Sequence, residues 1–262
     1  MTEIRILFID PVNTDIFDRY MEEVLRRAAP PGTQVDVTYL PQPGEPASPF
    51  LPSLPTYHGA LFRRIVQAEE EGYDGVIVGC SADPGVLEAK RMVSIPVTGP
   101  LEANLHLAAM LRARVTILLP AGVEARTRYW DLARAYGLDH KVSSIVSVDL
   151  HYPPQEECIR MMHEEPQKLL DLILEDHKEQ LAGPIADQAR RAVVEDGAQA
   201  IFLGCTFWTG MAGILAEALE SVSDPLDDRF AETLRVPVLD PGVDTLRLIV
   251  TLASTLKTPS LI

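Results

Sequence analysis

The chain has 262 residues, 47% of them hydrophobic, which is enough to bury one large core or two joined lobes. Its 23 basic and 38 acidic residues give a formal net charge of −15, which argues against nucleic-acid binding because phosphates require a basic surface. Three cysteines do not make a disulfide framework, and no apolar run is long enough to span a membrane. No signal peptide precedes the first predicted strand, so we expect a cytoplasmic protein with reduced thiols.

The first part of the chain alternates strand and helix patterns. The apolar run 4–10 predicts a strand covered on both faces, followed by a turn with the capping side chains Asn13 and Thr14. A helical stripe then runs to the stop at Pro30, and residues 35–40 alternate as a second strand. This order is typical of α/β proteins.

A proline-rich stretch follows from residue 41 to residue 55 and predicts an extended loop, either an exposed connector or a lid over a site. Residues 57–71 predict a helix that leads into a short buried strand ending at Cys80. The sequence Ser-Ala-Asp-Pro at 81–84 is typical of a capped helix start, and residues 93–98 predict a fourth strand.

The second part of the chain repeats this alternation. Its predicted helices are 102–112, 124–136 and 184–195, its predicted strands are 114–119, 144–148 and a third that ends at Cys205, and residues 242–256 close the chain. The segment near 151–183 has no counterpart in the first part, and we interpret it as an insertion with one helix near 167–176.

One motif occurs twice. Gly72-Tyr-Asp-Gly-Val-Ile-Val-Gly-Cys80 returns as Gly197-Ala-Gln-Ala-Ile-Phe-Leu-Gly-Cys205, and a related strand follows each copy, at 94–100 and at 235–241. A supersecondary unit written twice predicts two similar lobes, each a mostly parallel sheet wound with helices. The predicted lobes are residues 1–100, completed by 215–262, and residues 101–214.

Three polar residues follow predicted parallel strands: Asn13, Cys80 and Cys205. Ligands of such sheets bind beyond the carboxyl ends of the strands, so these residues are candidates for one site. A single cysteine after a buried strand is usually a small core residue, but two at equivalent places favour function. A helix start directly after each thiol would also lower its pKa from the ordinary ~8.5. Cys158 has no such setting, and we interpret it as incidental.

Several common kinds of site are absent from the sequence. His151, His163 and His177 are scattered without metal-ligand spacing, and we interpret them as surface residues. No glycine-rich dinucleotide motif follows the first strand, and no Gly-x-Ser-x-Gly elbow occurs. We therefore expect neither a metal nor a cofactor.

Two thiols that face one cleft suit proton transfer at carbon. One thiolate can remove a proton next to a carbonyl, and a thiol on the other face can return one, which inverts the centre. Amides near the thiols, with Asn13, Thr14, Ser81 and Thr206, would hold the substrate carbonyl or carboxylate. Simple capping is the alternative for Asn13 and Thr14.

These motifs resemble the aspartate/glutamate/hydantoin racemase superfamily, and within it the hydantoin racemase branch. The quoted stretch ending Cys80-Ser-Ala-Asp-Pro-Gly is similar to its first cysteine motif, and Leu203-Gly-Cys205 with Gly210-Met-Ala-Gly is similar to the second. The resemblance implies two lobes related by pseudo-twofold symmetry with the site between them, and racemisation without cofactor. It also implies Cys80 and Cys205 as the acid/base pair, and a homo-oligomer.

The chain departs from the family pattern near both thiols. Val12 separates proline from Asn13, and Thr206-Phe-Trp-Thr stands where a shorter turn is expected. Phe207 and Trp208 either line an apolar substrate pocket or pack beneath their turn. Glu102 matches a family position without a derived role, and an acid is favourable at a helix start. These departures bear on which substrate is accepted.

We therefore expect a racemase of a small molecule, with a 5-substituted hydantoin or related cyclic ureide as substrate. Alternatives are an aspartate/glutamate-type amino-acid racemase, or an isomerase or decarboxylase that uses the same site. From another class, a non-catalytic small-molecule binding protein would have structural cysteines that are inert to alkylation. A redox dithiol would need the two sulfurs within bonding distance.

Overall fold

The computed structural model describes residues 3–12, 14–41, 54–120, 123–220 and 235–258. Asn13 and most of the proline-rich stretch, residues 42–53, therefore lie outside the described residues. The chain divides into two compact units, each assembled from separate segments. Unit 1 comprises residues 1–100, 153–169 and 242–262, and unit 2 comprises residues 101–152 and 170–241.

The described part of unit 1 contains a parallel four-stranded sheet with the order β2-β1-β3-β4. Its strands are β1 (Ile4–Asp10), β2 (Thr33–Tyr39), β3 (Gly75–Val78) and β4 (Val97–Thr98). The fourth strand is shorter than the predicted 93–98, because only Val97 and Thr98 pair with β3.

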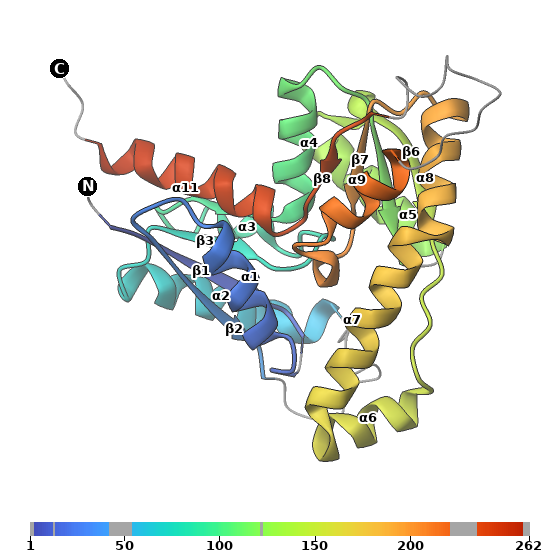
Figure 1. Cartoon of the computed structure of the whole chain (residues 1–262). Coiled ribbons are helices and arrows are strands. Elements are labelled where there is room, and N and C mark those ends of the chain that lie inside the picture. Colours follow the sequence, from blue (N-terminus) through green and yellow to red (C-terminus); the bar gives the residue numbers. More distant parts are fainter. Residues whose placement is uncertain (1–2, 13, 42–53, 121–122, 221–234, 259–262) are drawn as a thin grey trace. The chain divides into compact units, whose positions relative to one another are not determined.

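Helices cover both faces of the unit 1 sheet (Figure 1). They are α1 (Asp18–Ala28) and α11 (Val243–Lys257) on one face, and α2 (Leu54–Glu70) and the short α3 (Val86–Ala89) on the other. Successive side chains of β1 enter opposite cores, Ile6 and Phe8 on the α1 side and Leu7 and Ile9 on the α2 side. This explains why β1 reads as a continuous apolar run.

Unit 2 repeats this plan. Its strands are β5 (Val115–Leu119), β6 (Val142–Ser147), β7 (Ala200–Leu203) and β8 (Val238–Leu239). They are parallel and have the order β6-β5-β7-β8, which matches unit 1 strand for strand within the described residues. The prediction of an α/β fold with two similar halves is confirmed.

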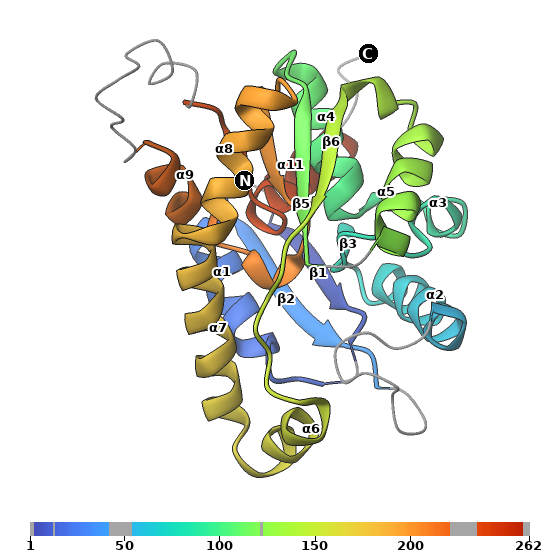
Figure 2. The same cartoon turned by 90° about the vertical axis from the view of Figure 1, so that its right-hand side faces the viewer.

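The helices of unit 2 lie on both sides of its sheet. They are α4 (Pro100–Met110), α5 (Val123–Ala135), α8 (Pro184–Glu195) and α9 (Ala212–Glu220). Figure 2 shows α8 and α5 on opposite sides of β5 and β6, and short 3-10 turns occur at Asp139–Lys141 and Thr206–Trp208. Within the described residues, no helix combines the length and the apolar character needed to cross a membrane.

The inserted segment contains two helices, α6 (Gln155–Glu164) and α7 (Pro166–Ala182), so the prediction of a single helix near 167–176 was wrong. Pro166 separates them, because proline fits the first turn of a helix and not the interior. The apolar stripe of α6 consists of only Cys158 and Met161 as buried residues, which left too little periodicity for prediction.

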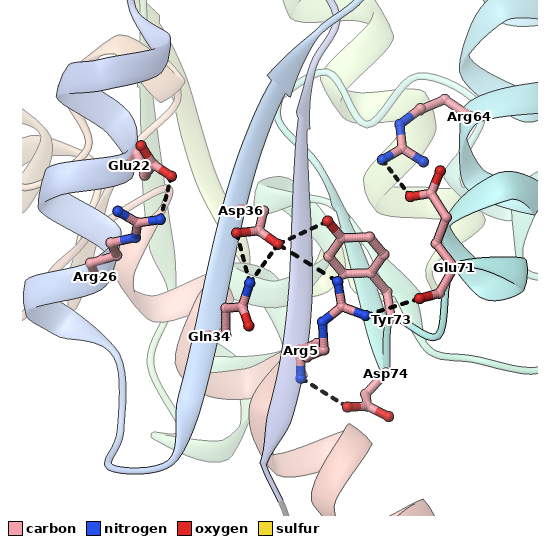
Figure 3. A network of polar contacts seen from close by, with 9 residues as sticks. All are labelled: Arg5, Glu22, Arg26, Gln34, Asp36, Arg64, Glu71, Tyr73 and Asp74. Carbon is pink, nitrogen blue, oxygen red and sulfur yellow. Dashed lines mark hydrogen bonds and ion pairs between the residues drawn. The ribbon is translucent and has the colours of Figure 1, made fainter.

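A network of polar side chains ties together the amino ends of the unit 1 strands (Figure 3). The backbone amide of Arg5 donates to Asp74 at 2.8 Å, and its guanidinium lies 4.4 Å from the centre of the Tyr73 ring. Tyr73 donates to Asp36 at 2.8 Å, and Lys257 donates to Asp74 at 2.7 Å. The polar groups at this edge of the sheet thus satisfy one another.

Candidate active site

In unit 1, Cys80 lies at the carboxyl edge of the sheet because of Gly79. The Gly79 amide donates to the Ile9 carbonyl at 2.7 Å and extends the pairing of β3 with β1 by one residue. A Cβ on Gly79 would lie 2.2 Å from a ring carbon of Phe8, so only glycine lets the chain leave the strand here. The Cys80 side chain is partly exposed.

Unit 2 places Cys205 in the same way. The Gly204 amide donates to the Leu118 carbonyl at 2.7 Å, and a Cβ on Gly204 would lie 2.6 Å from that oxygen. The hydroxyl of Tyr129, on α5, donates to the Gly204 carbonyl at 3.0 Å. Cys205 is partly exposed, as Cys80 is, so both glycines present a thiol at a strand end.

The chain after each cysteine forms a tight turn and not an α-helix, so that prediction was wrong. The Cys80 carbonyl accepts from the Asp83 amide at 2.9 Å, and the Cys205 carbonyl accepts from the Trp208 amide at 3.0 Å. The predicted cap Asp83 has a φ of 42°, and α3 begins only after Gly85, whose φ is 69°. A tight turn, and not the start of a long helix, therefore follows each cysteine.

A carboxylate lies at each turn, but it comes from a different element in each unit. In unit 2, Asp240 follows β8 and its Oδ2 accepts from the Gly210 amide at 2.7 Å. The equivalent position after β4 is Gly99, where a Cβ would lie 2.1 Å from Oδ1 of Asp83. The carboxylate is supplied by the strand end in unit 2 and by the turn in unit 1.

Buried polar atoms without a partner in the protein gather at both carboxyl edges. They are Asp10 Oδ1 and Ser81 Oγ in unit 1, and Ser147 Oγ and Trp208 Nε1 in unit 2. Other such atoms lie on helices, and one of them is Arg64 Nη1 of the polar network in Figure 3. An unsatisfied buried group costs about 1–3 kcal/mol, so these atoms are suited to binding a ligand.

Asp10 is a candidate that the sequence reasoning missed, although its place at the end of the apolar run was a usable signal. It lies one residue beyond the Ile9–Val78 pair, beside Gly79, and is 1% exposed. Burial raises the pKa of its carboxyl well above the usual range, and the nearby Asp18 adds to this. A neutral Asp10 can donate a hydrogen bond at this edge.

The structure places the remaining candidates within one unit or the other. Ser81 and Thr14 are buried in unit 1, where the Thr14 hydroxyl accepts from the Ile16 amide at 3.3 Å in a local turn, whereas the N-cap of α1 is Phe17. The unit 2 candidates Thr206, Phe207, Trp208 and Glu102 are all buried, the first three in the turn after Cys205 and Glu102 in the first turn of α4.

His177 is the second residue that the sequence reasoning missed. It is fully buried, so its interpretation as a surface residue was wrong, and nothing in the local sequence signals this burial. Its Nε2 is 3.1 Å from the Tyr152 hydroxyl, and its ring meets Trp208 edge to face at 6.2 Å between centroids. Burial lowers the pKa of His177 to about 4, against the opposite effects of Asp176 and the Phe207 backbone.

Further observations concern Cys158, metal ligands and disulfides. Cys158 is buried, its Sγ donates to the Pro153 carbonyl at 3.2 Å, and burial raises its pKa, which suits a structural residue. Over the part of the chain that the structure describes, no group of three or more His, Cys, Asp or Glu side chains is arranged to hold a metal. All three cysteines are described, and none forms a disulfide.

Fold and site together define an α/β protein of two similar units, each with a thiol at the carboxyl edge of a parallel sheet. A protein named hydantoin racemase from Pseudomonas sp. (strain NS671) is 29% identical over 258 residues, which span 93% of this chain and 89% of that protein. Another hydantoin racemase, from Paenarthrobacter aurescens, is 27% identical over 237 residues, which span 88% and 90%.

The structure also resembles a solved allantoin racemase from Klebsiella pneumoniae, with a TM-score of 0.71, 23% identity, and coverage of 97% of this chain and 89% of that one. This likeness concerns the fold. The family model described as Asp/Glu/Hydantoin racemase matches residues 6–248. The chain belongs to the Asp/Glu/hydantoin racemase family and is a racemase of a small molecule.

Proposed function

We propose that this racemase inverts the α-carbon of a 5-substituted hydantoin or related cyclic ureide, with Cys80 and Cys205 as its two bases. The observation that supports this is the repeat: Gly79 and Gly204 each pair with the neighbouring strand at 2.7 Å and each is followed by a partly exposed thiol. One thiolate removes the α-proton while the thiol on the opposite face returns another, and the two roles exchange for the other enantiomer.

The electrostatics favour a neutral ring over a free amino acid. A hydantoin carries its carbonyl next to the α-carbon, so the negative charge formed on deprotonation is delocalised onto that oxygen. The carboxylate of an amino acid must instead accumulate further negative charge. A chain of net charge −15 adds to that cost, and no cofactor is needed for the ring.

Donors at the carboxyl edges would stabilise the developing enolate. Ser81 Oγ is buried without a partner in the protein, and Thr206 follows Cys205 directly. In this proposal Ser81 and Thr206, with Asn13 and Thr14, hold the ring carbonyls, while Phe207 and Trp208 contact the 5-substituent. Glu102 completes the proposed set, without an assigned step.

The test is deuterium incorporation at the α-carbon in heavy water, followed together with optical rotation. Enantiopure 5-substituted hydantoins, allantoin, aspartate and glutamate are compared. We expect hydantoins or allantoin to exchange and lose rotation together, and Cys80→Ala and Cys205→Ala to abolish racemisation in both directions. Cys158→Ala is the matched control and should retain activity. Two results would contradict the proposal. One is deuterium exchange with aspartate or glutamate alone, and the other is near wild-type turnover in Cys80→Ser or Cys205→Ser.

Two accompanying proposals concern assembly and location. We propose a homo-oligomer, and sedimentation velocity across a range of concentrations should give a mass above the monomer's 28.9 kDa. We propose a cytoplasmic location, which suits three cysteines that form no disulfide. A monomer at all concentrations would contradict the first of these.

A further inference from the structure

The inserted helix α7 carries a buried histidine onto the turn that begins at Cys205. Within unit 2, the His177 ring contacts the Trp208 ring edge to face, 6.2 Å between centroids and at 75°. The Phe207 backbone is also close enough to raise the pKa of His177, although Nδ1 has no partner of hydrogen-bond geometry. His177 thus touches two successive residues of the turn.

The opposite side of the histidine is fixed by the segment before α6. The Tyr152 hydroxyl lies 3.1 Å from His177 Nε2. Next to it, the His151 amide donates to Asp176 at 3.2 Å, and the Gln180 side chain lies 2.9 Å from His151 Nδ1. Because residues on both sides of His177 hold α7 to this segment, the imidazole cannot shift without disturbing several contacts.

The turn that His177 contacts begins at Cys205 and helps to fix the position of this cysteine. The Trp208 amide donates to the Cys205 carbonyl at 3.0 Å and closes the turn, and Trp208 is fully buried. The Thr209 hydroxyl donates to the Thr206 carbonyl at 2.7 Å and tightens it further. The ring that His177 contacts and the amide that closes the turn therefore belong to one residue, Trp208.

The turn after Cys80, in unit 1, is built from different residues. The Cys80 turn is closed by the Asp83 amide, and the Asp83 carboxylate lies beside Gly99. Among the described residues, no helix stands between β2 and α2 as α6 and α7 stand between β6 and α8. The described contacts of His177 with Trp208 and the Phe207 backbone belong to the turn of unit 2.

We infer that His177 is a positioning residue for Cys205 and not for Cys80, holding the second thiol in place through Trp208 and Phe207. This inference rests on the proposed function insofar as Cys205 is one of the two bases. It gives the insertion a structural role, which is to support one thiol of the pair.

The first test does not depend on catalysis. Iodoacetamide alkylation of Cys80 and Cys205 is followed site by site by peptide mass spectrometry in the wild type, His177→Phe, His177→Gln and Tyr152→Phe. The phenylalanine keeps a ring but loses both nitrogens, whereas glutamine keeps a hydrogen-bonding group. His163→Gln, at an exposed position of α6, is the matched control.

We expect His177→Phe to change the Cys205 rate about tenfold while the Cys80 rate stays within about twofold, and Tyr152→Phe to change it in the same direction by less. His177→Gln keeps a hydrogen-bonding group for Tyr152 but loses the ring that contacts Trp208, so it should restore only part of the wild-type ratio of the two rates. An unchanged ratio in folded His177→Phe, or equal changes at both thiols, would overturn the inference. If His177→Phe does not fold, Tyr152→Phe decides by the same ratio.

The second test uses the reaction itself. A misplacement of about 1 Å can cost roughly 10²-fold in rate, so His177→Phe should lower kcat with little change in KM. Proton exchange without inversion should persist for the enantiomer that Cys80 deprotonates, because only the return from Cys205 is impaired. Exchange lost equally for both enantiomers argues against the inference. If the wild type racemises none of the compounds, the proposed function fails. The ratio of the two alkylation rates then still decides whether His177 positions Cys205.

Discussion

The buried His177 should make the protein sensitive to mild acid. Its pKa is lowered to about 4 in the folded protein from an ordinary 6.5, with burial as the main cause. Because the folded pKa lies below the unfolded one, the stabilisation is fully present above pH 6.5 and is lost as the pH falls through the folded pKa. The groups that face the ring are Tyr152, Trp208, the Phe207 backbone and, from the neighbouring position, Asp176.

The size of the effect follows from the two pKa values. A difference of about 2.5 units at ~1.36 kcal/mol per unit gives at most about 3.4 kcal/mol, and about 2.5 kcal/mol of this should be lost by pH ~4.5. A typical domain has only about 5–15 kcal/mol of stability in total. Protonation of this one side chain should therefore be visible in equilibrium unfolding.

The assay is urea unfolding of the wild type, His177→Gln and His163→Gln between pH ~7.5 and ~4.5, with the free energy of unfolding read from each transition. His177→Gln does not titrate, so the wild type should lose about 2–3 kcal/mol relative to it across this range. The exposed His163→Gln should follow the wild type. Parallel pH profiles for wild type and His177→Gln would refute the reasoning, because His177 would then carry no pH-dependent free energy.

Other predictions concern the two strand ends and the start of α1. Gly79→Ala and Gly204→Ala should each lower racemase activity by roughly 10²-fold or more, because their Cβ atoms would lie 2.2 Å from Phe8 and 2.6 Å from the Leu118 carbonyl. Gly213→Ala, which meets nothing within 4 Å, is the control, and activity near wild type in either strand-end variant would contradict the assignment. Burial raises the pKa of Asp18 to about 7 from 3.8, so the contribution of Asp18 to the stability of the folded protein falls as the pH rises through that range. Asp18→Asn should then raise the free energy of unfolding by about 1.4 kcal/mol at pH ~8, if only about a third of the pKa shift is counted because of solvent screening. If this increase in stability does not become smaller toward pH ~4, the ionisation of Asp18 is not its cause.

The parts of the fold predicted best are those with a strong local signal. The buried strands β1 and β5 and the helix α8 lie at or within one residue of their predicted bounds, since apolar runs and Pro184 at a helix start mark them clearly. The same signals misled at Asp83. An Asp-Pro pair is typical of a capped helix, but Gly85 takes a left-handed conformation and delays α3.

Only the part of the candidate site that belongs to the repeated motif could be predicted from the sequence. The Gly-Cys pairs identify both strand ends, because equivalent residues of duplicated units occupy equivalent places. His177 and Asp10 are different, because their importance comes from burial by elements distant in sequence. Asp10 meets Gly79 across a strand pair, and His177 reaches Trp208 only after α7 has packed. No periodicity within either segment contains that information.

The duplicated halves have diverged in how each thiol is held, and Gly99 offers a test on the Cys80 side. A Cβ at Gly99 would lie 2.1 Å from Oδ1 of Asp83, so Gly99→Ala must displace that carboxylate. The Asp83 amide closes the Cys80 turn at 2.9 Å, and the displacement should therefore change the alkylation rate of Cys80 by about tenfold and leave Cys205 within about twofold. This pattern is the reverse of that expected for His177→Phe. If Gly99→Ala leaves the Cys80 rate unchanged in the folded protein, Asp83 does not hold the first thiol, and the two halves are supported by elements other than those identified.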